Sequence, residues 1–252
     1  MISKKDANFL KTIIKRFNKS NLKNSNSFPL LEKGFSNEDI MSGIEVLLSG
    51  KITMSDITKK FENYFAKFVG SKYSLMVNSG SSANLLVAFA LVNPKKRKRL
   101  KAGDKFIIPA VCWSTSLWPL VQCGLKPEFI DVNIKNFCID ENLLKKKSRA
   151  KAIMNIHILG NSPNMDKLLN FAKSNNLYLI EDTCEALGSK YKSKFLGTFG
   201  DFGTFSFYYS HQITSGEGGM VTCDNDKDYE ILFSLRSHGW FGGTRFYARK
   251  FK

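Results

Sequence analysis

The sequence predicts an α/β protein, a three-layer αβα domain built around a seven-stranded, mainly parallel sheet. Short β-rich runs alternate with longer segments of helical apolar spacing between residues 73 and 223. With 252 residues and 43% hydrophobic content, the chain is long enough to bury the core that such a sheet requires. Seven strand-like runs occur, which suffice for one complete central sheet.

The predicted elements follow one another in a regular order. A polar N-terminal segment (1–35) precedes two amphipathic helices in residues 37–70, which end at Gly50 and Gly70 because glycine readily adopts the left-handed conformation that closes a helix. Crossover helices are predicted at residues 81–92, 118–124 and 162–176 from their apolar spacing and from glycine or asparagine stop signals. The predicted strands are residues 73–78, 105–110, 127–132, 152–158, 177–182, 204–208 and 218–223.

Composition and charge narrow the class of protein. The formal net charge is +16, but the lysines are scattered and no basic helix with interleaved aromatic residues occurs, so we expect no nucleic-acid partner. The chain has no apolar run of eighteen residues, and charges interrupt its apolar start, which favours a cytoplasmic protein without a membrane partner. The five cysteines lack the paired spacing of a metal site, so we expect buried thiols and no metal.

Ligands of open α/β sheets bind at the carboxyl ends of the strands, so the loops that follow those ends are the candidate site. The first such loop, "NSGSSANLL" (78–86), is a turn of small residues that opens a helix. The first-turn amides of Ser81, Ser82 and Ala83 and the helix dipole suit the binding of a phosphate. An ordinary N-cap built from serines explains the same residues equally well.

Two further loops carry chemically active side chains. In "LIEDTCEALGS" (179–189) a strand delivers Glu181 and Asp182 to its carboxyl end. Because side chains alternate along a strand, one carboxylate is expected to face the ligand and the other to point away, unless both are solvated turn residues. In "SFYYSHQITSGEGGMV" (206–221), Ser206 and His211 precede a glycine-rich turn. The other two histidines, His157 and His238, are expected to be structural.

The order of these motifs carries a resemblance to a known family. "SGSSANLL", "PAVCWSTSLWPLVQCGLKPEFIDV", "HILGNSPNMDKL", "EDTCEALGS" and "FSFYYSHQITSGEGGMV" occur in sequence between residues 79 and 221. Together they resemble the vitamin B6-dependent sugar aminotransferases of the DegT/DnrJ/EryC1/StrS type, which have fold type I and act on nucleotide-linked keto sugars. The resemblance covers roughly residues 30 to 240.

The resemblance implies a role for each matching residue. It places the phosphate of pyridoxal or pyridoxamine phosphate on the backbone of Ser81 and Ser82 and on the hydroxyl of Ser206. It places Trp113 against the face of the cofactor ring and Asp182 against the ring nitrogen. Glu185 corresponds to a polar residue near the phenolic oxygen of the cofactor.

His211 marks one branch of this family. Five residues after Ser206 the aminotransferases have the lysine that binds the cofactor covalently, and this chain has His211. An imidazole cannot take over that covalent role, but its ordinary pKa of about 6.5 suits it to moving protons near neutrality. The same replacement is typical of the 3-dehydratases of 4-keto-6-deoxy sugars, which act in deoxysugar and lipopolysaccharide O-antigen biosynthesis. The branch that regenerates its amine cofactor from L-glutamate fits best, because "LRSHGWFGG" (235–243) lacks iron–sulfur cysteines.

Some features depart from the family pattern. Gln212 stands where the dehydratases commonly have a second histidine, and Ser55 stands where a glycine is usual. Relatives continue into a C-terminal small domain, so we expect a cofactor-binding large domain at 36–240 and the start of a truncated region at 241–252.

We expect a homodimer. An aminotransferase of the same family and a truncated cofactor-binding module without activity remain as alternatives to the dehydratase.

Overall fold

The protein folds around one seven-stranded sheet, as the sequence predicts. The structure is a computed structural model that describes residues 3–21, 31, 34–53 and 55–240. The strand order is β1-β9-β8-β5-β4-β2-β3; β9 runs antiparallel to both neighbours, and the other pairs are parallel. A two-stranded hairpin, β6-β7, was not predicted. The strands are β1 (Tyr73–Val77), β2 (Lys105–Pro109), β3 (Lys126–Ile130), β4 (Ala152–Ile156), β5 (Tyr178–Asp182), β6 (Lys190–Tyr191), β7 (Lys194–Phe195), β8 (Phe202–Ser206) and β9 (Gly219–Cys223).

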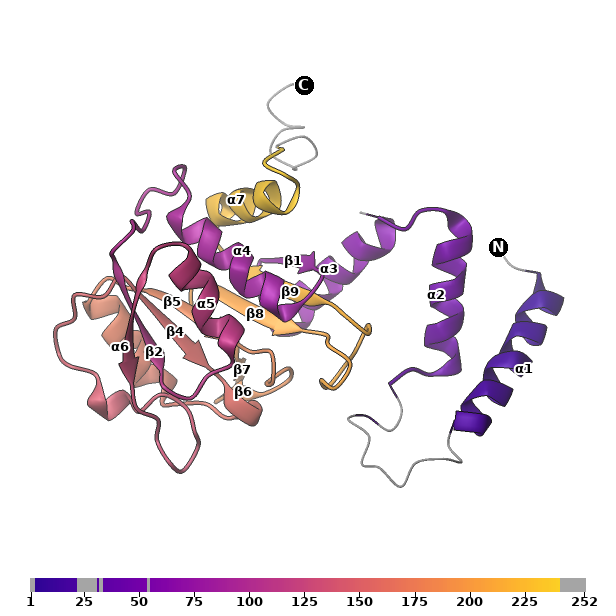
Figure 1. Ribbon diagram of the computed structural model, residues 1–252, viewed down its shortest axis with the longest axis horizontal. Helices are drawn as coiled ribbons and strands as arrows, with labels where there is room; N and C mark the ends of the chain where they lie inside the picture. Colours follow the sequence, from indigo (N-terminus) through magenta and orange to yellow (C-terminus); the bar gives the residue numbers. More distant parts are fainter. Residues whose placement is uncertain (1–2, 22–30, 32–33, 54, 241–252) are drawn as a thin grey trace.

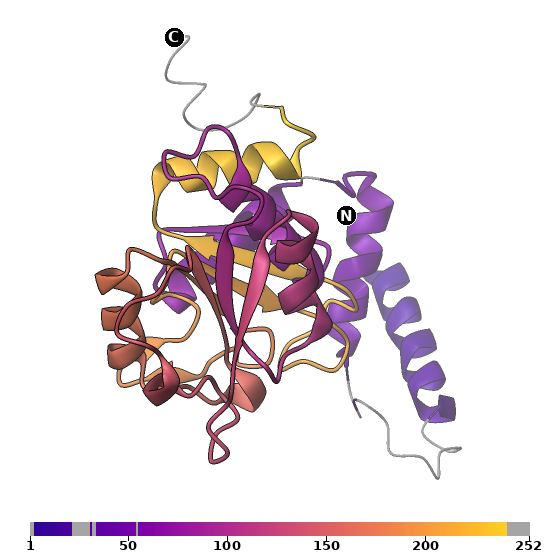
Figure 2. The same ribbon diagram turned by 60° about the vertical axis from the view of Figure 1, so that its left-hand side comes forward.

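Helices cover both faces of the sheet and complete the predicted three layers (Figures 1 and 2). α4 packs against α5 and α7, while α6 contacts β5 and α3 contacts β1. α7 was not predicted, and α5 begins four residues before the predicted 118–124 helix. The helices are α1 (Lys4–Asn21), α2 (Asn37–Ser49), α3 (Asp56–Val69), α4 (Gly80–Val92), α5 (Ser114–Gln122), α6 (Met165–Ser174) and α7 (Asp226–Arg236), with 3-10 turns at Glu141–Leu143 and Ile158–Gly160.

Alternate residues of the central strands feed two separate apolar cores. In β2, Phe106 and Ile108 pack into the cluster that contains α4, whereas Ile107 between them packs into the cluster that contains α6. β4 divides in the same way between Met154 and Ile153. Because both faces of these strands are buried, their sequences read as continuous apolar runs rather than as an alternation of apolar and polar residues.

The N-terminal region contains more structure than the sequence analysis expected. Residues 4–21, interpreted as part of a polar segment, form helix α1, which packs through the buried Ile14 against α2 and projects with it from the sheet (Figure 1). The overlooked start signal is Ser3, whose hydroxyl accepts the amide of Asp6 at 3.2 Å. Gly50 and Gly70 end α2 and α3 in the left-handed conformation, as predicted (φ 69° and 80°).

One lysine of the loop at 93–105 is buried, although this stretch was interpreted as solvated. Lys96 is 7% exposed, and its ammonium pairs with Asp228 of α7 and lies 4.5 Å from the ring centre of Tyr178 and 4.9 Å from that of Phe202. The rings and the carboxylate together replace the water that the ammonium loses. This pair fixes α7 at the amino ends of β5 and β8.

The prediction about the domain limits stays untested, and the prediction of buried thiols holds for only two of the five cysteines. Residues 241–252, interpreted as the start of a further region, lie outside the described residues, and the limits of the 36–240 domain stay a prediction. All five cysteines are free, but only Cys138 and Cys223 are buried, and the others are half-buried. Of the helices in the described ranges, none combines the length and apolarity that a membrane crossing needs. The cytoplasmic location stays a prediction.

Candidate active site

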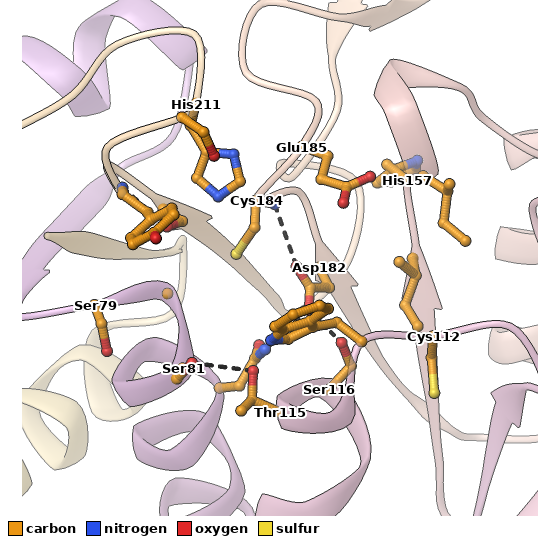
Figure 3. Close-up of a pocket in the computed structure, with 18 of the residues that line it drawn as sticks. Ser79, Ser81, Cys112, Thr115, Ser116, His157, Asp182, Cys184, Glu185 and His211 are labelled. Atoms are coloured by element: carbon orange, nitrogen blue, oxygen red, sulfur yellow. Dashed lines mark hydrogen bonds between the residues drawn. The ribbon is translucent and has the colours of Figure 1, made fainter. Parts of the chain in front are cut away.

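The candidate site lies where the carboxyl ends of five strands meet. The loops that follow β1, β2, β4, β5 and β8 enclose a cavity of about 650 Å³, a volume typical of a small-molecule site. Six of the predicted residues line it: Ser81, Trp113, Asp182, Glu185, Ser206 and His211. Figure 3 shows Asp182 in the middle of this view, with His211 and Glu185 above it and Ser81 and Thr115 below.

The start of α4 forms one wall of the cavity. The hydroxyl of Ser79 accepts the amide of Ser82 at 3.0 Å, so a serine N-cap is present and already occupies the Ser82 amide. Ser82 does not line the cavity, whereas Ser79 and Gly80, which were not singled out, do. Ser81 donates its hydroxyl hydrogen to Thr115 at 3.1 Å, which links the α4 and α5 walls.

Gly80 is required where α4 approaches the end of β8. A Cβ atom at this position would lie 2.7 Å from Cβ of Ser206 and 2.7 Å from Sγ of Cys184. The absence of a side chain lets the first turn of α4 lie directly beside the Ser206 hydroxyl. The partial positive charge of the helix N-terminus and this hydroxyl therefore point to the same part of the cavity, which suits an anionic group.

The two carboxylates at the end of β5 point to opposite faces, as strand alternation predicts. Asp182 lines the cavity, while Glu181 is completely buried, accepts hydrogen bonds from the amides of Gly197, Phe199 and Gly200, and lies 3.0 Å from Nε2 of His157. The alternative of two solvated turn residues is therefore wrong. Glu181 holds the turn that leads into β8, and Asp182 is the carboxylate available to a ligand.

Asp182 is held rigidly by a buried polar network. Its Oδ2 atom accepts a hydrogen bond from Asn84 Nδ2 at 2.8 Å and from Ser116 Oγ at 2.7 Å. Thr204 Oγ1 in turn donates to Asn84 Oδ1 at 2.7 Å, which orients the amide of Asn84 toward the carboxylate. Oδ1 accepts the amide of Cys184 at the longer distance of 3.2 Å. Oδ1 is therefore the oxygen with most capacity for a donor inside the cavity.

His211 lies half-buried at the opposite side of the cavity. Burial lowers the pKa of its imidazole below the ordinary value of 6.5, and the carboxylates of Glu185 and Asp182 partly oppose this shift. The ring meets that of Tyr208 edge-on, with centroids 6.0 Å apart. The lowered pKa keeps the ring neutral near pH 7, so it can accept a proton.

Trp113 and Glu185 complete the walls in different ways. The indole of Trp113 is 71% exposed at the N-cap of α5, so its ring face is available to a planar ligand. Glu185 Oε2 accepts the amide of Leu159 at 2.9 Å, and its backbone carbonyl accepts Nε2 of Gln212 at 2.7 Å. Glu185 therefore joins the segment after β4 to the segment that carries His211.

The other histidines follow the structural interpretation. His157 borders the cavity but is completely buried, with Nε2 3.0 Å from Glu181 Oε2 and Nδ1 3.2 Å from the carbonyl of Asn161. His238 lies outside the cavity in a turn with φ 60°. Both ring nitrogens of His157 are engaged, so it supports the floor of the cavity rather than reaching a ligand.

The comparison with known proteins covers most of the chain. Residues 35–251 match the DegT/DnrJ/EryC1/StrS aminotransferase family. The chain belongs to this family. Its large-domain fold is the fold type I expected from the resemblance.

Individual members of the DegT/DnrJ/EryC1/StrS family show how much of a longer protein is matched. GDP-4-keto-6-deoxy-D-mannose 3-dehydratase from Escherichia coli O55:H7 is 42% identical over 216 residues, which are 85% of this chain and 55% of that protein. GDP-perosamine synthase from Escherichia coli O157:H7 is 36% identical over 183 residues, which are 72% of this chain and 48% of the synthase. The chain thus spans about half the length of the curated relatives it matches.

Solved structures of the family agree with this relationship. A histidine-to-asparagine variant of GDP-4-keto-6-deoxymannose-3-dehydratase (ColD) with bound GDP-perosamine has a TM-score of 0.80 and 39% identity, covering 86% of this chain and 57% of its own. A structure of the same kind of dehydratase with a trapped PLP-glutamate geminal diamine has a TM-score of 0.79 and 38% identity, covering 90% of this chain and 57% of its own.

Several cavity residues of this family member were missed by sequence reasoning. Asn84 and Ser116 hold Asp182, and Thr115 binds Ser81, yet each lies inside a helix whose sequence does not identify its partner. A usable signal existed for Ser116, because a serine among the apolar residues of a buried helix face needs a hydrogen-bond partner. The partner itself is 66 residues away in the sequence.

Proposed function

We propose that this chain is the cofactor-binding domain of a dehydratase that removes the C3 hydroxyl of a nucleotide-linked 4-keto-6-deoxy sugar, with His211 as the base. One observation carries the proposal. His211 shares the cavity with Asp182 and Trp113, and no lysine is among the described residues that line it. The similarity to GDP-4-keto-6-deoxymannose dehydratases over most of the chain supports the same conclusion.

The cavity fits pyridoxal or pyridoxamine phosphate. Gly80 leaves room beside the Ser206 hydroxyl at the N-terminus of α4, where a phosphate gains both hydrogen bonds and the helix dipole. Asp182 would hold the protonated ring nitrogen through Oδ1, because Oδ2 is already occupied by two donors. The exposed indole of Trp113 would cover one face of the ring. Of the α4 residues, Ser79, Gly80 and Ser81 line the cavity, which supports placing them beside the phosphate in this proposal.

The division of labour follows from the positions of the side chains. When bound, the cofactor supplies the amine that joins the sugar ketone and the electron sink that lets the C3 hydroxyl leave. His211 accepts a proton at an imidazole nitrogen, since burial keeps its ring neutral near pH 7. The carboxylate of Glu185, which raises the pKa of His211 by its charge, stabilises the imidazolium that then forms. Asp182 stays fixed by three hydrogen bonds.

We include L-glutamate and a GDP-linked sugar in the proposal as the reactants. A related dehydratase structure holds a PLP-glutamate adduct and another holds GDP-perosamine, so the family accommodates both kinds of ligand. The proposal also includes a homodimer, supported by exposed apolar side chains such as Phe89 on α4 and Trp118 on α5 (47% and 54% exposed).

One relative favours the aminotransferase alternative, whereas the lack of a lysine among the described residues that line the cavity argues against it. GDP-perosamine synthase is 36% identical, but a transaminase of this family needs a lysine at the position of His211. A cofactor-binding module without activity would have the same cavity. It differs from the dehydratase in one measurable respect, because it would bind the cofactor without releasing a product.

The test begins with the cofactor alone. Purified protein is mixed with pyridoxal phosphate and L-glutamate, and the aldehyde absorbance band is expected to give way to the amine band. GDP-4-keto-6-deoxymannose is then added, and loss of its C3 hydroxyl is followed by mass spectrometry. His211→Asn is expected to bind the cofactor but to abolish both steps.

Borohydride reduction provides the control. The wild-type protein is expected to retain no covalently attached cofactor after reduction, whereas His211→Lys is expected to retain one per chain. A wild-type protein labelled at any lysine contradicts the dehydratase proposal and favours the aminotransferase. Binding without any change of the absorbance band favours the inactive module.

A further inference from the structure

Gln212 makes a contact that the sequence could not reveal. It follows His211 directly in the sequence. In the structure Nε2 of Gln212 donates to the backbone carbonyl of Glu185 at 2.7 Å. The bond therefore connects the His211 segment with the loop that follows β5 and Asp182.

The acceptor of this bond belongs to a rigid part of the molecule. Next to Glu185, the amide of Cys184 donates to Asp182 Oδ1 at 3.2 Å, and the amide of the buried Ala186 donates to the carbonyl of Thr183 at 3.0 Å. The Glu185 carboxylate itself accepts the amide of Leu159. The carbonyl that Gln212 binds is thus held in a fixed position relative to Asp182.

The segment that carries His211 has few other hydrogen bonds to the rest of the described chain, although the ring of Tyr209 lies 6.5 Å from that of Phe35. Among the described residues, the other hydrogen bonds of residues 208–215 stay within residues 206–217, such as His211 N to the carbonyl of Tyr208 at 3.1 Å and Ser215 N to the carbonyl of Phe207 at 3.1 Å. Local bonds of this kind shape a turn but do not fix its distance from the opposite wall. Gln212 supplies that missing connection.

We propose that Gln212 is a positioning residue, whose bond to the Glu185 carbonyl holds the His211 imidazole inside the cavity. Its effect on turnover rests on the proposed function, whereas its effect on the ring does not. Without the bond the segment is free to swing outward, and the ring regains water. The carboxylates of Glu185 and Asp182 act on the ring by charge, and the Tyr208 ring meets it edge-on. The other titratable groups that line the same cavity are Cys112, His157, Cys184 and Glu217.

The decisive experiment is an NMR titration of the protein without cofactor. The chain has only three histidines, so their imidazole signals are separable by single substitutions. Gln212→Met keeps the length of the side chain but removes the donor. The pKa of His211 in this variant is expected to rise toward 6.5, because the ring is less buried than in the wild type.

Two controls keep this result interpretable. Ile213→Ala changes the neighbouring side chain, which is 47% exposed, and is expected to leave the His211 titration unchanged. The signal of the buried His157 reports on the fold, so an unchanged His157 signal in Gln212→Met excludes general unfolding. A His211 pKa in Gln212→Met equal to that of the wild type overturns the proposal.

Turnover gives a second, separate readout. Loss of one hydrogen bond of about 1 kcal/mol corresponds to a decrease of roughly fivefold in kcat, with the acid limb of the pH profile moved to higher pH. If the wild-type protein shows no dehydration, the proposed function fails, while the NMR titration still decides the role of Gln212. An active Gln212→Met variant with an unchanged kcat and an unchanged acid limb would also overturn the proposed positioning role of Gln212.

Discussion

Glu181→Gln is expected to destabilise the protein by about 4 kcal/mol, although it changes only one atom and leaves the side-chain volume intact. In the wild type, Oε1 accepts the amides of Phe199 at 2.6 Å and Gly200 at 2.8 Å. Oε2 accepts the amide of Gly197 at 3.0 Å and lies 3.0 Å from His157 Nε2. Both oxygens therefore face two partners each, in a site without solvent.

A glutamine offers only one acceptor oxygen, so its NH₂ group must face either the Phe199 and Gly200 amides or the Gly197 amide beside His157 Nε2. At least one hydrogen bond to a charged acceptor is lost, which contributes roughly 1.5–3 kcal/mol, and a buried amide is left without its partner, which costs about 1–3 kcal/mol more. The sum is about 2.5–6 kcal/mol. At roughly 2–4 °C per kcal/mol, the midpoint of thermal unfolding falls by about 8–16 °C.

Thermal unfolding followed by circular dichroism measures this difference, and the chain contains a matched control. Glu185→Gln makes the same chemical change four residues later, at an exposed carboxylate that accepts only the Leu159 amide. Its effect is expected to stay below about 1 kcal/mol. The reasoning is refuted if Glu181→Gln lowers the unfolding midpoint no more than Glu185→Gln does.

Three further predictions follow from the same geometry. Ser116→Ala removes a hydrogen bond to the buried Asp182 and is expected to lower the free energy of unfolding in urea by about 1.5–3 kcal/mol and to weaken cofactor binding. Ser114→Ala, at an exposed position of the same helix, is expected to change neither quantity. Equal behaviour of the two variants would contradict the hydrogen-bond network around Asp182. Because the pKa of His211 lies below 6.5, turnover is expected to hold as the pH falls through 6.5 and to decline only below it; a decline centred above 6.5 would exclude this base. Lys96→Met leaves its buried carboxylate partner, Asp228, unpaired and is expected to lower the free energy of unfolding by about 3–5 kcal/mol, measured by urea unfolding at pH 7; a loss below about 1 kcal/mol would contradict the role of this pair.

The sequence predicted the sheet well because its strands are short apolar runs separated by glycine, asparagine and charged loops. All seven predicted strands occur in one sheet, with ends that differ by up to two residues. Helix α1 was missed because its polar composition obscures the few apolar positions that pack on α2, and packing rather than propensity stabilises such a helix.

The candidate site was predicted unevenly for a related reason. Asp182 and Glu181 could be assigned to opposite faces, because alternation along a strand is a local rule. The sequence could not show that Ser79 already occupies the Ser82 amide, or that Asn84 and Ser116 hold Asp182 from two different helices. These contacts depend on where separate elements pack, and no spacing along the chain encodes them.

By itself, the sequence determined the αβα architecture, the edge of the sheet that carries the ligand site, and the histidine at the position of a family lysine. The tertiary structure decided which oxygen of Asp182 is available, how α4 approaches Ser206, and which bond holds His211 in the cavity. The physical reason is the distance along the sequence over which each kind of interaction acts. Periodicity and capping act within a few residues, whereas hydrogen bonds across the cavity join segments that lie 27 to 98 residues apart.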